Sequence, residues 1–334
     1  MISFIAVYIV TGLILIGLAR QRRLYGARGI AAGLVVTWLT LGVLAGGAEA
    51  YFRFAYAASD TPMQWTLAGQ NWIARYMRFN SLGYRDREWT PAELEGKTVL
   101  FAVGDSFTEG WGIDDPAQRF PDRLQAMLGD GYAVVNLGKG GSSTLHQTQA
   151  VMDYPNAVPD IIVWQYLLND IDVAAISNGY NWDSPIPLDR PALVEESHLV
   201  NFIYWRVFRQ GMFNSPQGIP QWDWLYGAYD DAYIWGIHSA EIERMTAYAD
   251  SVGARLITVI FPNMEDPVRS VPYVDRVEQL LVGLGHTDVL KTTDLAAAMP
   301  LEQRIVSRAD AHPSAAFNAA VAEMIYKRFF LSVP

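Results

Sequence analysis

From residue 98 onward, short apolar runs alternate with stretches of helical periodicity, and this alternation is the strongest constraint on the fold. Each apolar run is long enough for a buried strand of a parallel sheet. The predicted strands are 98–103, 132–137, 160–166 and 255–261. The predicted helices are 117–129, 145–153, 236–252, 272–284 and a last one from Pro313 to about Phe330. Strands and helices in this order predict an α/β domain of three layers, with helices on both faces of the sheet.

The composition excludes several classes of chemistry. The chain has 334 residues and a formal net charge of −10, and an acidic surface repels phosphate backbones. Nucleic acid is therefore not an expected partner. The sequence contains no cysteine, so it has no disulfide, no thiolate zinc site and no iron–sulfur cluster. We expect no metal site, because the histidines other than His312 show no metal-ligand spacing. They are His146, His198, His238 and His286.

Two long apolar runs, 2–19 and 29–48, precede the predicted domain. Each has close to the roughly 20 residues that cross the hydrocarbon core of a bilayer. The segment between them, 20–28, is rich in arginine, and the positive-inside rule places it in the cytoplasm. We therefore expect a transmembrane helical hairpin in a bacterial cytoplasmic membrane, with the N-terminus and everything after residue 50 on the periplasmic or extracellular side. A cleaved signal peptide followed by one span is disfavoured, because the positive charges follow the first run instead of preceding it.

The rest of the chain divides into three predicted parts. Residues 51–97 are expected to be a connector that packs on the main domain, which begins at residue 98 and continues to 334. The stretch 174–235 interrupts the alternation of strands and helices and is dense in aromatic residues and prolines. An insertion this apolar could pack on its own domain as a lid, lie on the membrane surface, or contact another membrane protein. The two apolar helices offer a second possible contact surface for such a partner.

A candidate nucleophile follows the first predicted strand. Residues 104–110 read Gly-Asp-Ser-Phe-Thr-Glu-Gly, directly after the apolar run 98–103. A serine on a tight turn at the carboxyl end of a strand exposes its hydroxyl where it can meet a carbonyl group. Ser106 is thus the candidate nucleophile. Glu109, in the same motif, could bind a substrate hydroxyl, although a solvated loop carboxylate is the commoner case.

Acyl transfer by serine also needs a base, a group that orients the base, and donors for the oxyanion. The glycine-rich segment 138–141 follows the second predicted strand, and Asn169 follows the third. His312 comes directly before Pro313, and proline favours the first position of a helix. Asp310 lies two residues earlier, so in an extended segment it points to the same side as His312. The pair could therefore serve Ser106 as base and orienting acid.

These blocks resemble those of the SGNH (GDSL) hydrolase superfamily. The similarity covers about residues 78–330 and includes Asn80-Ser81-Leu82-Gly83-Tyr84-Arg85-Asp86, a segment that recurs in membrane-bound bacterial members. The resemblance implies a flavodoxin-like sandwich around a parallel sheet. It also implies hydrolysis or transfer of acyl groups, from acetyl esters on glycans or from lipid esters, without a metal or organic cofactor.

The resemblance further implies a role for each site residue. Ser106 would be the nucleophile, His312 the base, and Asp310 the group that orients His312. The oxyanion donors would be the Ser106 N–H, the Gly141 N–H and the Asn169 side chain. Asp105 and Asp170 are interpreted as buried supports of these groups.

The sequence departs from the family pattern at two positions. The family usually places its aspartate three residues before the histidine, where this chain has Ala309, and Asp310 is one residue closer. The third block commonly reads Gly-x-Asn-Asp, and here the glycine position is Leu167. The first departure concerns the orientation of His312, and the second concerns the width of the oxyanion pocket.

Two functions remain open at this point. The first is a membrane-anchored serine esterase or acyltransferase that acts on acyl esters of an envelope glycan or lipid outside the cytoplasm. The second is a catalytically silent subunit with the same fold that stabilises a larger membrane complex, such as an envelope-glycan, respiratory or photosynthetic assembly. The second hypothesis is motivated by the two apolar helices and the aromatic insertion, since fold alone does not dictate function.

Overall fold

The computed structural model describes residues 2–20, 28–59, 66–182, 190–208 and 220–331. They form two compact units. The first consists of Met1–Arg75 and Ile186–Met212, and the second of Tyr76–Pro185 and Phe213–Pro334. These units divide the chain at other places than the domains expected from the sequence. The predicted connector is split after residue 75, and the middle of the aromatic insertion belongs to the first unit.

The second unit is built on a five-stranded parallel sheet with the strand order β2-β1-β3-β4-β5. The strands are β1 (Thr98–Val103), β2 (Tyr132–Asn136), β3 (Ile161–Leu167), β4 (Arg255–Phe261) and β5 (Val289–Lys291). The predicted α/β fold with a parallel sheet is confirmed, and the four predicted strands are present within one residue at either end. The fifth strand has only three residues, too few to give a periodic signal.

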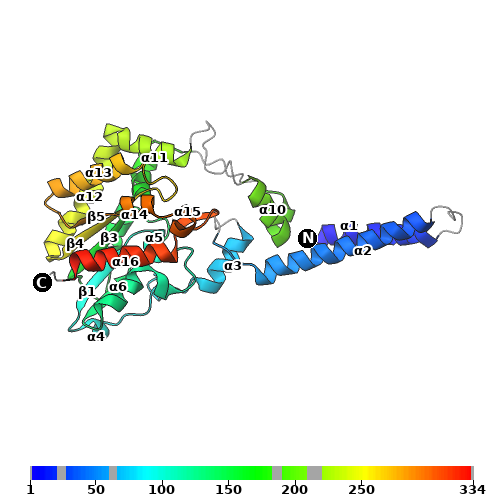
Figure 1. The fold of residues 1–334 in the computed structure, drawn as a ribbon, viewed down its shortest axis with the longest axis horizontal. Helices are drawn as coiled ribbons and strands as arrows, with labels where there is room; N and C mark the ends of the chain where they lie inside the picture. The colour runs from blue at the N-terminus through cyan, green and yellow to red at the C-terminus, as the bar shows by residue number, and fades with distance from the viewer. Residues whose placement is uncertain (1, 21–27, 60–65, 183–189, 209–219, 332–334) are drawn as a thin grey trace. The chain divides into compact units, whose positions relative to one another are not determined.

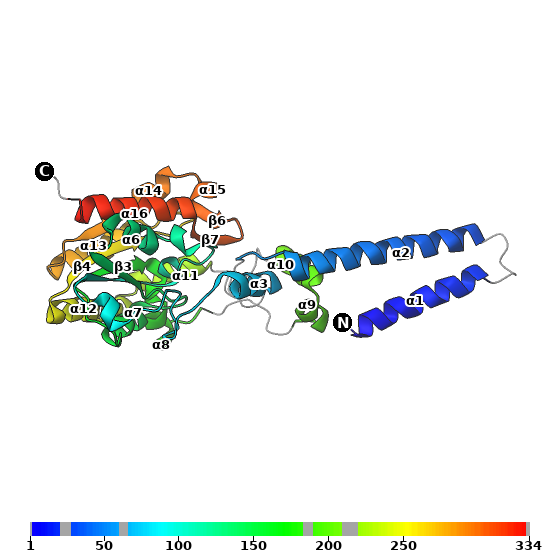
Figure 2. The same ribbon diagram turned by 90° about the horizontal axis from the view of Figure 1, so that it is seen from below.

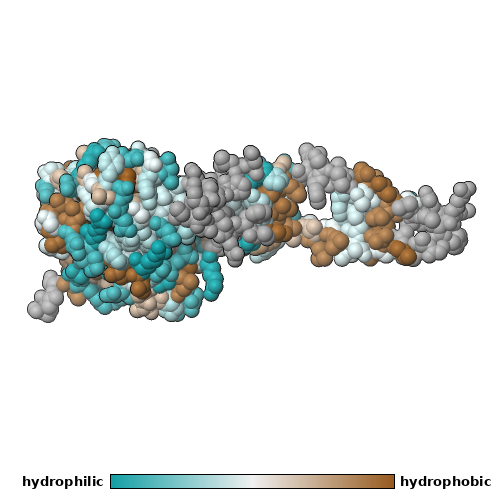
Figure 3. Space-filling model, turned by 90° about the horizontal axis from the view of Figure 1, so that it is seen from above, coloured by the Kyte–Doolittle hydropathy of each residue, from teal (hydrophilic) through white to brown (hydrophobic). Residues whose placement is uncertain are grey.

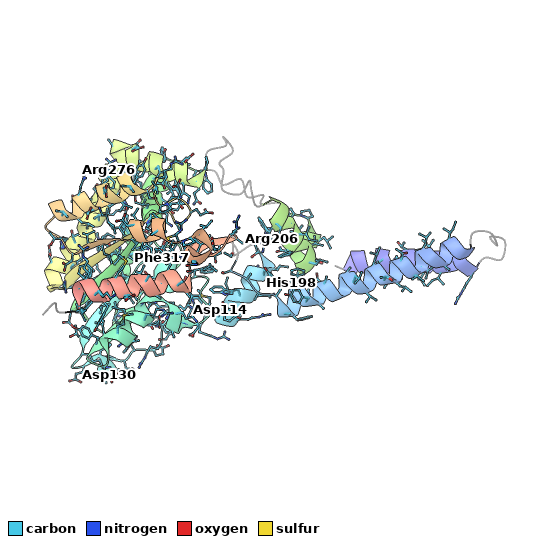
Figure 4. All side chains as sticks on the ribbon, in the orientation of Figure 1. Asp114, Asp130, His198, Arg206, Arg276 and Phe317 are labelled. Atoms are coloured by element: carbon cyan, nitrogen blue, oxygen red, sulfur yellow. The ribbon has the colours of Figure 1, made fainter. Side chains whose placement is uncertain are left out.

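Helices cover both faces of this sheet, as Figure 2 shows. On one face lie α6 (Phe120–Leu128), α14 (Thr293–Ala298) and α16 (Ala315–Phe329), and α6 packs beside α16 (Figure 1). On the other lie α7 (Thr144–Met152), α11 (Gln221–Asp230), α12 (Ala232–Val252) and α13 (Val271–Gly283). Phe317 of α16, labelled in Figure 4, is fully buried, and its ring centroid lies 6.0 Å from that of Phe261 on β4. The core is therefore divided into two layers by the sheet.

An antiparallel hairpin stands outside the main sheet and carries the C-terminal motif. Its strands are β6 (Ile305–Ser307) and β7 (Asp310–Pro313). The expectation that Pro313 opens the last helix is wrong: Pro313 ends β7, and Ser314 caps α16 by accepting a hydrogen bond from Phe317 N. A serine hydroxyl satisfies one of the free N–H groups at a helix start, so the helix begins after it, at Ala315.

Short elements connect the layers of the second unit. They are α4 (Pro91–Leu94), α5 (Ser106–Glu109), η3 (Pro116–Gln118), η4 (Leu168–Ile171), α8 (Asp172–Ser177) and α15 (Leu301–Arg304). The described part of the aromatic insertion from residue 220 onward packs on its own domain. Trp224, Tyr226 and Tyr229 of α11 are buried in the core, and Trp224 stacks on Tyr180. Residues 183–189 and 209–219 of the insertion lie outside the described residues.

The first unit contains two long apolar helices, α1 (Ile2–Arg20) and α2 (Arg28–Ala50). They pack against each other where Tyr8 stacks on Trp38, with ring centroids 4.0 Å apart. Gly42 leaves the space that the Tyr8 hydroxyl fills. The unit also holds a π-helical turn and three shorter helices: η2 (Tyr51–Ala55), α3 (Leu67–Tyr76), α9 (Ala192–Glu196) and α10 (His198–Phe208).

Large apolar side chains are exposed along the two long helices, and Figure 3 shows them as brown patches between paler residues. By length and composition, one candidate membrane span occurs among the described residues, Ala32–Ala55 with 24 residues. The first helix contributes a shorter apolar stretch, Tyr8–Gly17. The segment 21–27, on which the predicted orientation depends, lies outside the described residues. One apolar helix consistent with an anchor or a signal sequence is thus present, and two spans with a periplasmic domain stay a prediction.

Candidate active site

The nucleophile turn is formed where β1 ends. Asp105 caps the short helix α5, since its Oδ1 accepts a hydrogen bond from Phe107 N at 2.8 Å, and Ser106 is the first residue of that helix. Gly104 is required in front of it, because a Cβ there would lie 2.2 Å from Gln165 Oε1. Gln165 is fully buried in the central strand, and its Oε1 accepts hydrogen bonds from Asp105 N and Thr108 Oγ1. Gln165, the only residue of β3 with an amide side chain, therefore holds the turn in place.

A chain of hydrogen bonds joins the three residues that were predicted from distant parts of the sequence. Ser106 Oγ lies 2.9 Å from His312 Nε2, and His312 Nδ1 lies 2.5 Å from Asp310 Oδ1. The same carboxylate oxygen accepts the backbone N–H of His312 at 3.1 Å. Asp310 is fully buried, whereas the His312 side chain is 14% exposed. The imidazole is thus fixed on one side and reaches the hydroxyl on the other.

The shorter aspartate spacing is explained by the strand β7. Asp310 and His312 both belong to it, and in a strand residues two apart project from the same face. Gly112 packs closely against this region, because a Cβ there would lie 3.0 Å from Asp310 Oδ2. The departure from the family pattern therefore leaves the orientation of His312 intact.

The charges around His312 favour its protonated form. Burial alone would lower the pKa of His312, but the Asp310 carboxylate, through its charge and its hydrogen bond, and the charges of Asp105 and Glu109 outweigh this. The pKa of His312 is therefore raised above its ordinary value of 6.5. A base of this kind accepts a proton from the serine hydroxyl readily and then stays charged beside the carboxylate.

The expected oxyanion donors follow three adjacent strands of the sheet. Ser106 follows β1, Gly141 follows β2 and Asn169 follows β3, so all three come from the carboxyl edge. Gly141 is exposed and has φ +74°, a conformation that favours glycine. Within the described part of the chain its N–H donates no hydrogen bond. Asn169 is half-buried in η4, and its side chain lies close enough to Asp105 to favour the ionised form of that carboxyl.

The two aspartates interpreted as supports are both buried. Burial raises the pKa of Asp105, and it raises the pKa of Asp170 well above the usual range. Asp170 Oδ1 accepts a hydrogen bond from Gln147 Nε2 at 3.0 Å, and Gln147 in turn accepts one from Trp164 Nε1 at 2.6 Å. Asp170 is therefore held by α7, and the charge of Asp105 also raises its pKa.

Glu109 is not the solvated loop carboxylate that its position in the motif suggests. Its side chain is 4% exposed, and its Oε2 accepts a hydrogen bond from Gly140 N at 3.0 Å. Burial raises its pKa to about 7, against the opposing effects of the Gly140 hydrogen bond and the Arg85 charge. The carboxylate therefore contacts the loop that presents Gly141.

Two buried arginines near the site were not anticipated. Arg85 donates hydrogen bonds to Gly110 O at 2.6 Å and to Ile113 O at 2.7 Å, and Arg119 donates to Glu109 O at 3.2 Å. Both therefore support the loop that follows the nucleophile. Burial, together with the Arg119 charge, lowers the pKa of Arg85 to about 10. The segment 80–86 was the signal that could have identified Arg85.

The two arginines also line a cavity of about 610 Å³. Ser106 and His312 are not among the residues that line it. The cavity is thus distinct from the candidate active site.

Comparison with known proteins gives one family match and several distant likenesses. The chain matches the GDSL-like Lipase/Acylhydrolase family over residues 102–320. An acetylxylan esterase from Xylanibacter ruminicola is 33% identical over 100 residues, which cover 28% of this chain and 20% of that protein. The chain thus matches about a fifth of the length of this curated relative.

Among the solved structures that align with this one is a member of the lipolytic protein G-D-S-L family from Veillonella parvula, 14% identical with a TM-score of 0.40. That alignment covers 70% of this chain and 98% of the other. A carbohydrate acetylesterase family member from Sinorhizobium meliloti is 15% identical with a TM-score of 0.39, over 69% of this chain and 96% of the other. Because the family match extends over more than half of the sequence, the chain belongs to the GDSL-like lipase/acylhydrolase family.

Proposed function

We propose that this protein is a serine-dependent esterase or acyltransferase that acts on ester-linked acyl groups. The observation that carries the proposal is the pair of short contacts at His312, 2.9 Å to Ser106 Oγ and 2.5 Å to Asp310 Oδ1. A nucleophile, a base within hydrogen-bond reach and a group that orients the base are the parts that acyl transfer by serine requires.

In the first half of the reaction, Ser106 Oγ attacks the ester carbonyl carbon while His312 Nε2 takes the hydroxyl proton. The carbonyl oxygen becomes an oxyanion, and the donors for it are the N–H groups of Ser106 and Gly141 and the amide of Asn169. The tetrahedral intermediate then collapses, the ester C–O bond breaks, and the imidazolium returns its proton to the leaving alcohol. The acyl group is left on Ser106 as an ester.

In the second half, an acceptor hydroxyl attacks the acyl-enzyme. His312 takes the proton of the acceptor, and Ser106 leaves with that proton when the intermediate collapses. Water as the acceptor gives hydrolysis, and a sugar hydroxyl gives acyl transfer. The choice between them depends on how well the site excludes water.

A short acyl group, such as acetyl on a carbohydrate, is the substrate class that we infer. The rings of Phe107 and Trp111 flank His312, with centroids 5.5 Å and 6.2 Å from that of the imidazole. Both rings lie next to the imidazole that faces Ser106 Oγ. The relative named as an acetylxylan esterase supports the same class.

We further propose that α1 and α2 anchor the protein in a bacterial cytoplasmic membrane, with the catalytic domain on the periplasmic or extracellular side. The apolar surface of both helices and the arginine-rich segment between them support this arrangement. Esters of the cell envelope would then be within reach of Ser106.

The test is turnover of 4-nitrophenyl acetate and of acetylated oligosaccharides by the full chain in detergent. The wild type and a Ser251→Ala control, which changes an exposed serine of α12, are expected to release acetate at equal rates. Ser106→Ala is expected to lose about 10³-fold or more of kcat. A wild type as inert as Ser106→Ala on every ester would contradict the proposal and favour a silent structural subunit.

A further inference from the structure

The glycine-rich loop after β2 is pressed against the nucleophile helix α5. A Cβ on Gly138 would lie 2.2 Å from Glu109 N and 2.5 Å from the Thr108 carbonyl carbon, both of which are backbone atoms. Asn136 Nδ2 donates a hydrogen bond to Thr108 O at 2.9 Å, and Lys139 N donates one to Gly104 O at 3.2 Å. These contacts fix the first half of the loop to the turn that carries Ser106.

The second half of the loop is held by a turn in which Ser142 N donates a hydrogen bond to Lys139 O at 3.1 Å, and Gln147 Nε2 donates one to Ser142 O at 3.2 Å. Glu109 is a third support. Its Oε2 accepts the Gly140 N–H at 3.0 Å, and a Cβ on Gly140 would lie 2.9 Å from the same oxygen. Gly141 is the next residue, so the orientation of the Gly140 peptide influences the direction of the Gly141 N–H. Its N–H makes no hydrogen bond within the described ranges, so the fold leaves it available to a ligand oxygen.

Burying the Glu109 carboxylate costs free energy, which the Gly140 hydrogen bond and the Arg85 charge offset. Glu109 is 4% exposed, and burying a carboxylate is unfavourable unless the charge accepts hydrogen bonds or faces an opposite charge. A hydrogen bond to an ionised acceptor is shorter and stronger than one between neutral groups. Above its pKa of about 7, the Glu109 carboxylate is therefore a strong acceptor for the Gly140 N–H.

We propose that Glu109 is a positioning residue for the oxyanion site: its carboxylate fixes the Gly140 amide and so sets the direction of the Gly141 N–H. The proposal rests on the proposed esterase function, since the Gly141 donor matters only when an oxyanion forms. Glu109 itself does not contact the reacting atoms. It acts through the loop.

Charged or titratable groups act on Glu109 from several elements. The charges of Arg85, before β1, and of His312, on β7, favour its ionised form, and that of Asp105, at the start of its own helix α5, opposes it. Arg119 donates a hydrogen bond to the Glu109 carbonyl oxygen at 3.2 Å. Because the charge of Glu109 contributes to the raised pKa of His312, removing that charge should lower the pKa of His312. The acid limb of the activity profile then moves to lower pH, which reports the Glu109 charge acting on His312.

The experiment compares Glu109→Ala and Glu109→Gln with the wild type, and uses Glu95→Ala, an exposed carboxylate, as the matched control. The readouts are kcat and KM for 4-nitrophenyl acetate from pH 5 to 9, with the melting temperature of each full-length variant in detergent. Glu109→Ala is expected to lose about 10- to 100-fold in kcat with little change in KM, because misplacing one group costs about this much. Glu109→Gln keeps an oxygen that accepts the Gly140 N–H, so most of kcat should return, with the acid limb at lower pH.

Three results would overturn the proposal. The first is that Glu109→Ala folds and keeps the kcat of the wild type. The second is that the kcat of Glu109→Gln is as low as that of Glu109→Ala. The third is that the acid limb of Glu109→Gln lies at the same pH as that of the wild type. If Glu109→Ala does not fold, the pH profile of Glu109→Gln alone decides. Failure of the proposed function is recognised separately, because the wild type would then be as inert as Ser106→Ala.

Discussion

At the scale of single residues, the site depends on how a strand places two side chains. The hydrogen bond from His312 to Asp310 exists because β7 is extended, so a spacing of two residues suffices. A helical segment would have required a different spacing.

We predict that Asp310→Asn lowers kcat by about 10³-fold or more, because the imidazole is no longer held in the correct tautomer and its charge is no longer stabilised. Asp310 raises the pKa of His312, so its removal lowers that pKa. The acid limb of kcat/KM, which in the wild type lies above pH 6.5, should therefore move to lower pH. Asp130→Asn, at the exposed carboxylate labelled in Figure 4, is the control and should leave both unchanged.

The sequence was sufficient to predict which residues could form the hydrogen-bonded chain, because each follows a recognisable strand or precedes a helix. The sequence was not sufficient to predict the side chains that hold these site residues in place. The contacts of Gln165 and Arg85 join residues far apart in the chain, and no local pattern encodes such a partner. The burial of Glu109 likewise depends on the loop from a neighbouring strand.

At the scale of elements, the carboxyl ends of β1 and β2 are joined more tightly than their sequences suggest. Asp86 Oδ2 accepts a hydrogen bond from Asn136 N at 2.9 Å, and Asn136 binds Gly138 N and Thr108 O through its side chain. The segment before β1 therefore supports both loops at once. Strands β1 to β4 were predictable from their apolar runs. The short strands β5, β6 and β7 were not, because three or four residues give no periodicity.

We predict that Gly138→Ala destabilises the second unit by about 1–3 kcal/mol, because the new Cβ would overlap backbone atoms of Thr108 and Glu109 that cannot move without disturbing α5. The matched control is Gly131→Ala, where a Cβ meets nothing within 4 Å. Chemical denaturation of both variants measures the difference. Equal stability of Gly138→Ala and the wild type would show that the loop and α5 are not in contact in solution.

At the scale of the whole molecule, the chain combines an apolar helical unit with an α/β unit that contains the complete candidate site. Ser106, His312 and Asp310 all belong to the second unit. The first unit presents large apolar side chains to its surroundings, including Val36, Val43 and Leu44 of α2. A surface of this kind is expected in contact with lipid or with another membrane protein.

We predict the orientation in the membrane from the arginine-rich segment, and the absence of native cysteine makes it directly measurable. In cells of a Gram-negative host with a permeabilised outer membrane, a membrane-impermeant maleimide should label Ala117→Cys of η3. Gln21→Cys, in the arginine-rich segment, should be labelled only after lysis. The reverse pattern would contradict the proposed periplasmic location of the catalytic domain.

Active-site titration tests directly whether the fold makes one serine a nucleophile. The full-length protein in detergent is treated with a fluorophosphonate, and the modified peptide is identified by mass spectrometry. One adduct is expected, on Ser106, and it should form at a much lower rate in His312→Gln. No adduct on Ser106 in the folded wild type, or equal rates with and without His312, would contradict this expectation.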